Sequence, residues 1–349
     1  MPLIQTRNSG GSVHHLLSGS YTNHTLFLLA FDTVAKTLTL NNTVPGFGLH
    51  QYVTTNAARN RIYATAMSEP PQLFSWSVDE NYQFEHLNTV NVTSSSCYFS
   101  GQGQYAFSAG GPTARIHKLD EDGSIADQVY EMLYVPEQEV PNVDKTRNSV
   151  LYGAHGFDVN VNKKGFVPHL AFNSIFMYDI ADNGTAKLDS INLSPTEGDG
   201  PRNSFPSKDG KLLYVVNMRG KFTYRSNTVQ PSRDGQYLFT STRGWNNTEA
   251  NGWVAAFQLD KKGYLKKEQA LTYYKAPLTL GSAAGLRVAF WEDDTNSNPK
   301  GLTDYMYLSD TSKGYMYILG WTPSSKTISE VASLQYPENS SPYEAVWLD

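Results

Sequence analysis

The sequence predicts an all-β chain with many short strands. Short runs of Tyr, Val, Leu and Phe alternate with clusters of Gly, Asn, Asp and Ser, and helical periodicity is hard to find. Runs of this length between turn residues are typical of strands rather than helices. Clear examples are Tyr237–Thr242, Trp253–Leu259 and Tyr305–Ser309.

A repeated turn organises these strands. Pro206–Tyr214 and Pro231–Phe239 are near copies, in which Ser, a basic residue, Asp and Gly precede an aromatic strand, and weaker copies begin at Asn56, Ser100 and Asn160. A second motif of strand, Asp, polar turn and Leu or Ile lies half a repeat later. Two hairpins per repeat make one four-stranded antiparallel blade. Blades of about 40–50 residues therefore predict a β-propeller of seven or eight blades, forming a single domain over residues 1–349 with its site at the central axis.

The spacing of the turn motif has one irregularity. Successive copies are 44, 60, 46 and then 25 residues apart, and the last step holds barely half a blade. Either one blade lacks its outer hairpin, or a segment is missing near residues 221–222. We favour the missing segment, because a bare half-blade would expose sheet edges. Gly111-Pro112 is a second place where the hairpin is short.

Charge and composition argue against several classes of binding partner and cofactor. The net charge is −5 and no block of Lys or Arg occurs, which argues against nucleic acid. No apolar run approaches the roughly 18–20 residues of a membrane helix. The single cysteine, Cys97, excludes an internal disulfide framework. We expect no metal and no cofactor, since His14-His15 has no third ligand at metal spacing and Gly101-Gln-Gly103 does not continue as a dinucleotide fingerprint.

Seven Asn-X-Ser/Thr sequons occur, and Asn192 is the weakest because Pro195 follows it closely. They arise by chance in an Asn- and Ser-rich chain, or they mark N-linked glycans. The glycan interpretation predicts a secreted protein or one in the secretory pathway. No signal peptide is present, and Met1–Leu3 looks like an added start on a mature chain. The six sequons predicted to carry glycans are Asn23, Asn41, Asn91, Asn183, Asn246 and Asn339.

Candidate site residues are expected at blade starts, where strands meet the axis and a small-molecule substrate would bind. His155, between small residues in Gly153–Phe157, suits general acid/base chemistry. Arg202 and Arg243 suit binding of a carboxylate or enolate oxygen. Glu344 suits a second acid/base or an arginine partner. Each of these residues also has a purely structural interpretation. His155 could be a packed core histidine, Arg202 and Glu344 could form local ion pairs, and Arg243 could stack on a surface Trp. Further candidates at blade starts are Gln51, Tyr52, Asn203, Arg225, Ser282 and Tyr343.

Five motifs fall in an order that carries a family resemblance: His14–Leu17, Ala154–Phe157, Gly198–Arg202, Thr240–Arg243 and Ala345–Asp349. The chain resembles the fungal 3-carboxy-cis,cis-muconate lactonizing enzymes of the seven-bladed lactonase group. The resemblance implies a seven-bladed propeller without a metal, which adds a carboxylate across a double bond to close a lactone. It also implies that His155, Arg202 and Arg243 match family site positions.

The chain departs from that family at two positions. Met218 or Asn217 stands where the family carries a Glu, and Ser282 stands where it carries a His. Secreted, glycosylated fungal proteins similar to the family include surface glycoproteins and the hetero-Diels–Alderases of tropolone sesquiterpenoid biosynthesis. Because Met218 suits an apolar ligand better than a dicarboxylate, we favour the latter branch.

The favoured hypothesis is that the protein is a cyclase of fungal secondary metabolism. It would join a tropolone-derived quinone methide to a humulene-type terpene by intermolecular hetero-Diels–Alder cycloaddition, a reaction that gains from orientation and excluded water. Arg202 and Arg243 would stabilise the tropolone oxygens and His155 would act as the acid. Substrate-binding residues would be Tyr52, Met218, Trp245, Ser282, Tyr343 and Glu344. The alternatives are a 3-carboxymuconate cycloisomerase, a sugar-lactone hydrolase and a non-catalytic secreted glycoprotein.

Overall fold

The computed structural model describes residues 12–143, 153–218, 224–244, 251–277, 283–291 and 304–349. Its regular structure is β apart from one 3-10 turn, η1 (Glu137–Glu139), so the predicted all-β class is confirmed. The strands fall into two compact units, one with β4 to β17 and the other with β1 to β3 and β18 to β26. The assignment of one domain over residues 1–349 stays a prediction.

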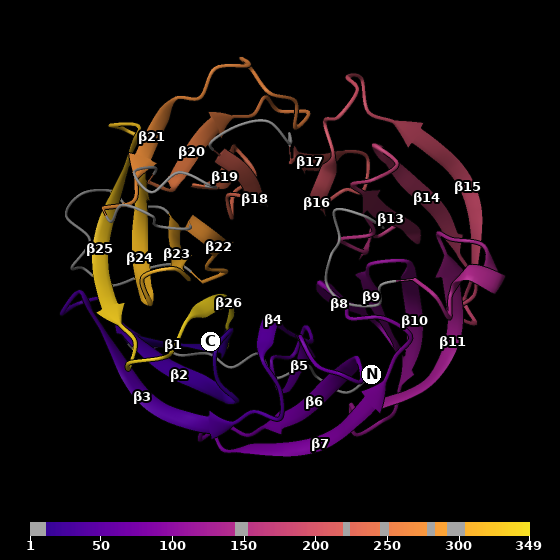
Figure 1. Cartoon of the computed structure of the whole chain (residues 1–349). Coiled ribbons are helices and arrows are strands. Elements are labelled where there is room, and N and C mark those ends of the chain that lie inside the picture. Colours follow the sequence, from indigo (N-terminus) through magenta and orange to yellow (C-terminus); the bar gives the residue numbers. More distant parts are fainter. Residues whose placement is uncertain (1–11, 144–152, 219–223, 245–250, 278–282, 292–303) are drawn as a thin grey trace. The chain divides into compact units, whose positions relative to one another are not determined.

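The first unit contains three four-stranded antiparallel sheets and one two-stranded sheet (Figure 1). Their strands are β4 (His50–Thr55), β5 (Arg61–Ala66), β6 (Gln72–Val78) and β7 (Phe84–Asn91); β8 (Tyr98–Gln102), β9 (Tyr105–Gly110), β10 (Thr113–Leu119) and β11 (Ile125–Leu133); β12 (Asp158–Val159), β13 (Lys164–His169), β14 (Ser174–Ile180) and β15 (Ala186–Leu193); and β16 (Pro201–Pro206) with β17 (Leu213–Asn217).

The second unit contains three four-stranded antiparallel sheets. The C-terminal strand β26 pairs with β1, so the two ends of the described chain share one sheet. The strands are β26 (Pro342–Trp347), β1 (Val13–Ser20), β2 (Thr25–Asp32) and β3 (Thr37–Pro45); β18 (Tyr224–Pro231), β19 (Tyr237–Gly244), β20 (Trp253–Gln258) and β21 (Thr272–Lys275); and β22 (Ala283–Val288), β23 (Asp304–Asp310), β24 (Tyr315–Thr322) and β25 (Thr327–Gln335).

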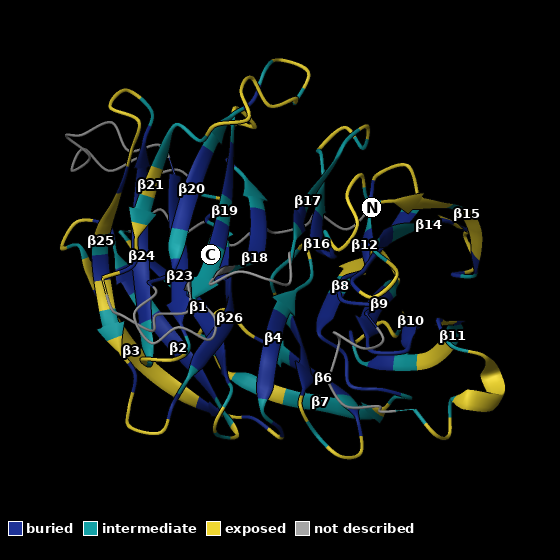
Figure 2. Ribbon diagram, turned by 45° about the horizontal axis from the view of Figure 1, so that its top comes forward, coloured by how far each residue is buried: buried dark blue, intermediate teal, exposed yellow. Residues whose placement is uncertain are grey.

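We name the strands of each sheet A to D in pairing order, starting from β4, β8, β12, β16, β18, β22 and β26. Among strand residues, most of the exposed ones lie on the D strands, as the yellow parts of β3 and β15 show in Figure 2, whereas the B strands are mostly buried. This alternation fits the predicted blades. The prediction that every blade has four strands is wrong for β16–β17, because no third strand joins them in the described residues. Only six residues lie between the end of β17 at Asn217 and the start of β18 at Tyr224.

The repeated turn is confirmed at the level of hydrogen bonds. In one copy the Ser207 hydroxyl donates to Asp209 Oδ1 at 2.7 Å, and in the other Ser232 donates to Asp234 Oδ1 at 2.6 Å. Each turn ends on a glycine with φ of +70°, a backbone conformation that favours glycine. The two copies therefore form the same turn, held by the same Ser-to-Asp hydrogen bond and closed by a glycine with positive φ.

The two suspected gaps in the chain have different outcomes. Thr113 on β10 pairs directly with Gly110 on β9, so Gly111-Pro112 is a complete two-residue hairpin turn and needs no further residues. Residues 221–222 lie outside the described residues. The short step of the repeat therefore corresponds, in the part that is described, to the two-stranded sheet β16–β17.

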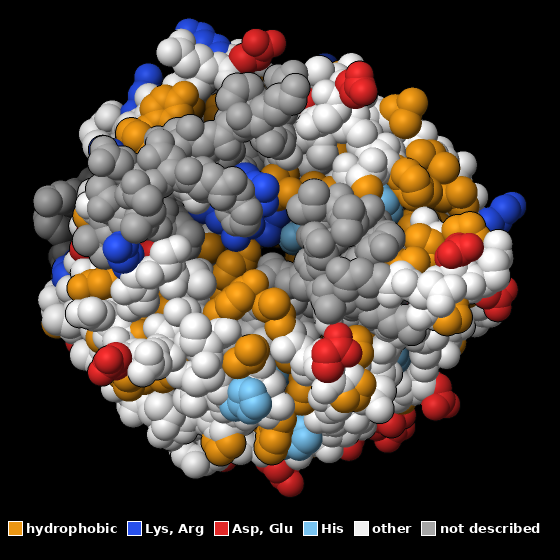
Figure 3. Space-filling model, in the orientation of Figure 1, with side chains coloured by type: hydrophobic (Ala, Val, Ile, Leu, Met, Phe, Trp, Pro, Cys, Tyr) orange, Lys and Arg blue, Asp and Glu red, His pale blue; other side chains and the backbone are white. Residues whose placement is uncertain are grey.

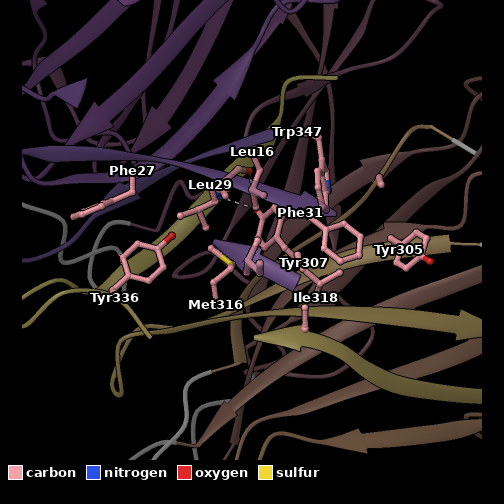
Figure 4. Close-up of a cluster of buried hydrophobic side chains, with 14 residues drawn as sticks. Leu16, Phe27, Leu29, Phe31, Tyr305, Tyr307, Met316, Ile318, Tyr336 and Trp347 are labelled. Carbon is pink, nitrogen blue, oxygen red and sulfur yellow. Dashed lines mark hydrogen bonds between the residues drawn. The ribbon is translucent and has the colours of Figure 1, made fainter. Parts of the chain in front are cut away.

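Large apolar side chains fill the space between neighbouring sheets of each unit. Figure 4 shows one such cluster in the second unit, where Leu16, Phe31, Tyr307, Ile318 and Trp347 come together. They come from two sheets, with β1, β2 and β26 in one and β23 and β24 in the other. Fully burying one such side chain contributes roughly 1.5–3 kcal/mol, so this cluster holds the β26–β1 sheet against the sheet β22–β25.

Candidate functional site

The predicted acid/base residue His155 is buried in the first unit. It precedes β12, and its backbone N–H donates to Pro168 O at 3.1 Å. Its Nδ1 lies 3.0 Å from Oδ1 of Asn203 on β16. Because an amide oxygen only accepts, Nδ1 carries the hydrogen and Nε2 is the atom that can take up a proton. The structure thus brings together two of the residues that the sequence singled out.

Arg202 immediately precedes Asn203 in the sequence. It is buried, with 2% of its surface exposed. It lies on β16, in the bulge between Pro201 and Asn203 where the pairing with β17 shifts register. Met218 follows β17, is half-buried, and its N–H donates to Gly200 O at 2.6 Å. A β-bulge re-aims a side chain relative to its neighbours, which gives Arg202 a direction of its own on this strand.

A polar chain runs along the A strands of the first unit. Of its members, Tyr52 was predicted from the sequence as a substrate-binding residue, and the other three were not predicted. The Tyr52 and Tyr98 rings lie 4.6 Å apart. Tyr98 donates to Asp158 Oδ1 at 2.5 Å, and Ser204 donates to Asp158 Oδ2 at 2.7 Å. Burial, followed by the Asp158 charge, raises the pKa of Tyr98 well above its usual value. The chain ties β4, β8, β12 and β16 together. Its only sequence signal is that every member lies at a blade start.

Arg243 faces another arginine in the second unit. Arg225 on β18 lies directly opposite Arg243 on β19, in an antiparallel pairing. Burial, followed by the Arg243 charge, lowers the pKa of Arg225. Like charges directly opposite on neighbouring strands destabilise a sheet. A carboxylate matches the fork geometry of a guanidinium group, so this pair of arginines is a candidate anion-binding site.

Tyr343 and Glu344 are buried on β26 of the second unit. The Tyr343 hydroxyl donates to Asn227 Oδ1 at 3.3 Å, and its ring lies 5.5 Å from Tyr21. Glu344 Oε2 accepts a hydrogen bond from Tyr307 at 2.8 Å. Burial and the Glu344 charge raise the pKa of Tyr307 well above its usual value. Both residues thus have partners inside the sheets. Trp245 and Ser282 lie outside the described residues.

A pocket of about 430 Å³ opens on the β18–β21 sheet. It was not predicted from the sequence, because its lining residues lie on three strands and meet only through the strand register. Thr242 pairs with Trp253, and Trp253 with Lys275, whose Nζ lies 5.8 Å from the Trp253 ring centre. The pocket is lined by Thr240, Thr242, Trp253, Ala255 and Tyr273.

No group of three or more His, Cys, Asp or Glu suited to a metal occurs among the residues that the structure covers. No described helix is long and apolar enough to cross a membrane. On the face drawn in Figure 3, acidic side chains form separate patches, whereas several Lys and Arg side chains lie together in one group.

Comparisons with known proteins place the chain in a family. Residues 15–223, more than half of the chain, match the family described as lactonase, seven-bladed β-propeller. Muconate cycloisomerase 1 of Cutaneotrichosporon cutaneum is 23% identical over 374 residues, which cover 96% of this chain and 98% of that protein.

Two solved structures are similar over nearly the whole chain. The periplasmic gluconolactonase of Pseudomonas aeruginosa has a TM-score of 0.75 at 17% identity, covering 96% of this chain and 99% of its own. A Lactobacillus plantarum protein has a TM-score of 0.72 at 17% identity, covering 97% and 100%. At these identities the likeness concerns the fold alone. With the family match, these findings confirm the predicted propeller and the predicted family: the chain belongs to the seven-bladed β-propeller lactonases.

Proposed function

We propose that this protein is an enzyme that closes an oxygen-containing ring on a small unsaturated carboxylate, as a lactone-forming cycloisomerase does. The observation that carries the proposal is the Arg225–Arg243 pair, two cations facing each other on neighbouring strands. The lactonase family and the 23% identical muconate cycloisomerase support the same reaction class. The location of the site at the propeller axis stays a prediction, because Arg202 belongs to the first unit and Arg225 to the second.

The reaction has two bond-making steps. One carboxylate oxygen of the substrate bonds to the distal carbon of a conjugated double bond, and the displaced π electrons move toward a second carboxylate as an enolate. A proton then adds to the neighbouring carbon. The arginine pair stabilises the negative charge that gathers on the second carboxylate. A protonated His155 Nε2, held by the Nδ1–Asn203 hydrogen bond, is the proposed proton donor.

Turnover of 3-carboxy-cis,cis-muconate tests the proposal. Lactone formation is followed by mass spectrometry in the wild type and in Arg243→Gln, Arg225→Gln and His155→Gln. We expect kcat/KM to fall by at least about 100-fold in each, as for loss of one oxyanion donor. Lys275→Gln removes a cation from the D strand of the Arg243 sheet and is the matched control, with turnover expected to stay at the wild-type level. No lactone from the wild type, or full activity in Arg243→Gln, would refute the proposal.

The aromatic pocket favours a second candidate, the hetero-Diels–Alder cycloaddition of a tropolone-derived quinone methide with a humulene-type terpene. Trp253 and Tyr273 form an apolar wall in the 430 Å³ pocket, which a dicarboxylate does not need. In this reaction Arg243, on β19 of the same sheet as the pocket, would hold a tropolone oxygen. The roles of Arg202 as a second oxygen ligand and of His155 as the acid stay predictions from the sequence. The test is an adduct from hydroxymethyl tropolone and humulene above the uncatalysed background, lost in Trp253→Ala and retained in Lys211→Ala, a change at an exposed turn.

We further propose that the protein is secreted and carries N-linked glycans. Asn41 and Asn91 lie exposed on the D strands β3 and β7, and Asn183 and Asn339 lie on exposed turns. Asn23 differs, because its Nδ2 donates to Asn339 O at 3.2 Å and to Ser340 Oγ at 2.9 Å. Peptide mapping of protein from a eukaryotic host is expected to find glycan at the exposed sites and none at Asn23. A modified Asn23 would contradict this ranking. Asn246 lies outside the described residues.

A further inference from the structure

The sheet β16–β17 has a free edge. Among the described residues, its B strand β17 pairs with β16 and with no third strand, whereas the B strands of the other six sheets pair on both sides. Five of six residues are buried in each of the B strands β5, β9 and β13, but one of five, Val216, is buried in β17. The sequence of β17 has the apolar character of a covered strand, and the structure leaves it half-covered.

Alternate residues of β17 direct their backbone N–H and C=O groups away from β16, toward this edge. The Ser207 N–H donates to Leu212 O at 2.8 Å, which starts the ladder between the two strands. Residues of an antiparallel ladder alternate between bonding the partner and facing away. With Leu213 opposite Pro206 and Val215 opposite Ser204, the N–H and C=O groups of Leu213, Val215 and Asn217 face away from β16.

The β17 edge also lacks the features that protect sheet edges. Charged residues and proline on an edge strand prevent pairing with another chain. Each of the six D strands carries one, whereas β17 (Leu-Tyr-Val-Val-Asn) carries neither. The protecting residues are Pro45 on β3, Glu85 on β7, Asp127 on β11, Lys187 on β15, Lys275 on β21 and Glu330 on β25.

We propose that β17 pairs antiparallel with β17 of a second copy of this chain. The product is a four-stranded sheet in the order β16, β17, partner β17, partner β16, which has the strand number of the other six sheets. Antiparallel pairing about a two-fold axis at Val215 sets Val215 opposite the partner's Val215, and Leu213 opposite the partner's Asn217. All of these residues turn their backbone groups outward, so the pairing is self-complementary. No charges meet, because β17 has none.

The oligomeric state of the full chain tests this pairing. Light scattering after size exclusion is expected to give about twice the 38.8 kDa chain mass for the wild type. Val215→Pro removes an N–H that β16 does not use and blocks the edge, so we expect a monomer. Val215→Thr keeps the N–H and the β-branched shape, so it is the matched control and stays dimeric. A monomeric wild type, or a dimeric Val215→Pro, overturns the proposal.

A cross-link gives an independent readout that does not depend on how Val215→Pro folds. The one native cysteine, Cys97, is buried, so Val215→Cys in a Cys97→Ala background presents one accessible thiol per chain. Cα atoms of a hydrogen-bonded antiparallel pair are about 5.5 Å apart, within the roughly 4.4–6.8 Å that a disulfide spans. We expect a covalent dimer under mild oxidation, and none from Lys211→Cys in the same background. A monomer that instead binds an extended peptide from another protein would also refute pairing with a second copy.

Discussion

Tyr98 on β8 donates its hydroxyl hydrogen to Asp158 on β12 with 2.5 Å between the oxygens, which ties the A strands of two consecutive sheets. The same carboxylate accepts from Ser204 on β16. A buried carboxylate with two hydroxyl donors fixes the spacing of three sheets, and His155 and Asn203 lie on the segments that it connects.

Replacement of Asp158 separates the role of its acceptor atoms from that of its charge. Asp158→Ala leaves the Tyr98 and Ser204 hydroxyls without this acceptor, so we expect the free energy of unfolding to fall by about 2–4 kcal/mol. Asp158→Asn keeps the side-chain shape and one acceptor oxygen, and a hydroxyl accepts from the new amide, so a loss of about 1 kcal/mol is expected. Urea unfolding measures both. Equal losses would show that the negative charge, rather than the acceptor positions, is what matters.

Arg115 on β10 is a fully buried cation in the first unit. Its Nε donates to Glu131 Oε1 at 3.0 Å, and its other nitrogens donate to the hydroxyls of Ser94, Ser96 and Thr113. Burial lowers the pKa of Arg115 to about 10. Arg115→Met leaves the Glu131 carboxylate without this partner, and we expect a loss of about 3 kcal/mol in unfolding free energy. Lys163→Ala, which breaks an exposed ion pair with Asp182, is the control and should leave the unfolding midpoint unchanged. A similar midpoint in both variants would contradict the role of Arg115.

Two buried histidines make stability depend on pH. Burial lowers the pKa of His169 to about 3 and that of His117 to about 4, whereas an unfolded His titrates near 6.5. Below pH 6.5 the unfolded chain binds protons that the folded chain does not. Stability is therefore full above pH 6.5 and falls as the pH drops toward 4, by up to about 1.4 kcal/mol per pH unit for each group.

The variant His169→Asn tests this linkage. His169 Nδ1 accepts from the Phe172 N–H at 3.1 Å, and the amide oxygen of Asn lies near the same position without titrating. We expect the unfolding free energy of His169→Asn to fall less steeply between pH 6.5 and 4.5 than that of the wild type. Urea unfolding at several pH values measures the slope. Parallel curves would mean that His169 carries no part of the acid sensitivity.

Local patterns of the sequence predicted the blade architecture. The Ser-x-Asp-Gly turns at 207–210 and 232–235 are fixed by contacts within a few residues, so their copies identified the hairpins and the A strands. The short 25-residue step indicated either a blade without its outer hairpin or a missing segment near residues 221–222. The described residues contain the two-stranded sheet β16–β17, and the missing segment stays a prediction.

Pairs of side chains far apart in the sequence were beyond the reach of such patterns. Tyr98 meets Asp158 through the packing of one sheet on the next, and Arg225 lies opposite Arg243 through the register of two strands of one sheet. No local motif sets either arrangement. Arg115 was missed for another reason: hydropathy patterns treat an arginine in a strand as solvent-facing, whereas Glu131 and three hydroxyls satisfy it inside the sheet.

Gly153 and Gly198 form a matched pair for testing how the backbone holds His155. Both have positive φ, of 78° and 76°, so alanine at either position costs about 1–2 kcal/mol from backbone strain alone. A Cβ at Gly153 would also lie 2.4 Å from Ala171 N and 2.6 Å from His169 Nδ1, whereas a Cβ at Gly198 meets nothing within 4 Å. We expect Gly153→Ala to lose about 1–3 kcal/mol more than Gly198→Ala in urea unfolding.

The same pair of variants tests catalysis. Because the Leu170 N–H donates to Gly153 O at 2.7 Å, the displaced segment moves His155 as well, and kcat should fall in Gly153→Ala alone. Equal kcat in the two variants, with the stability difference present, would mean that the position of His155 does not limit the reaction.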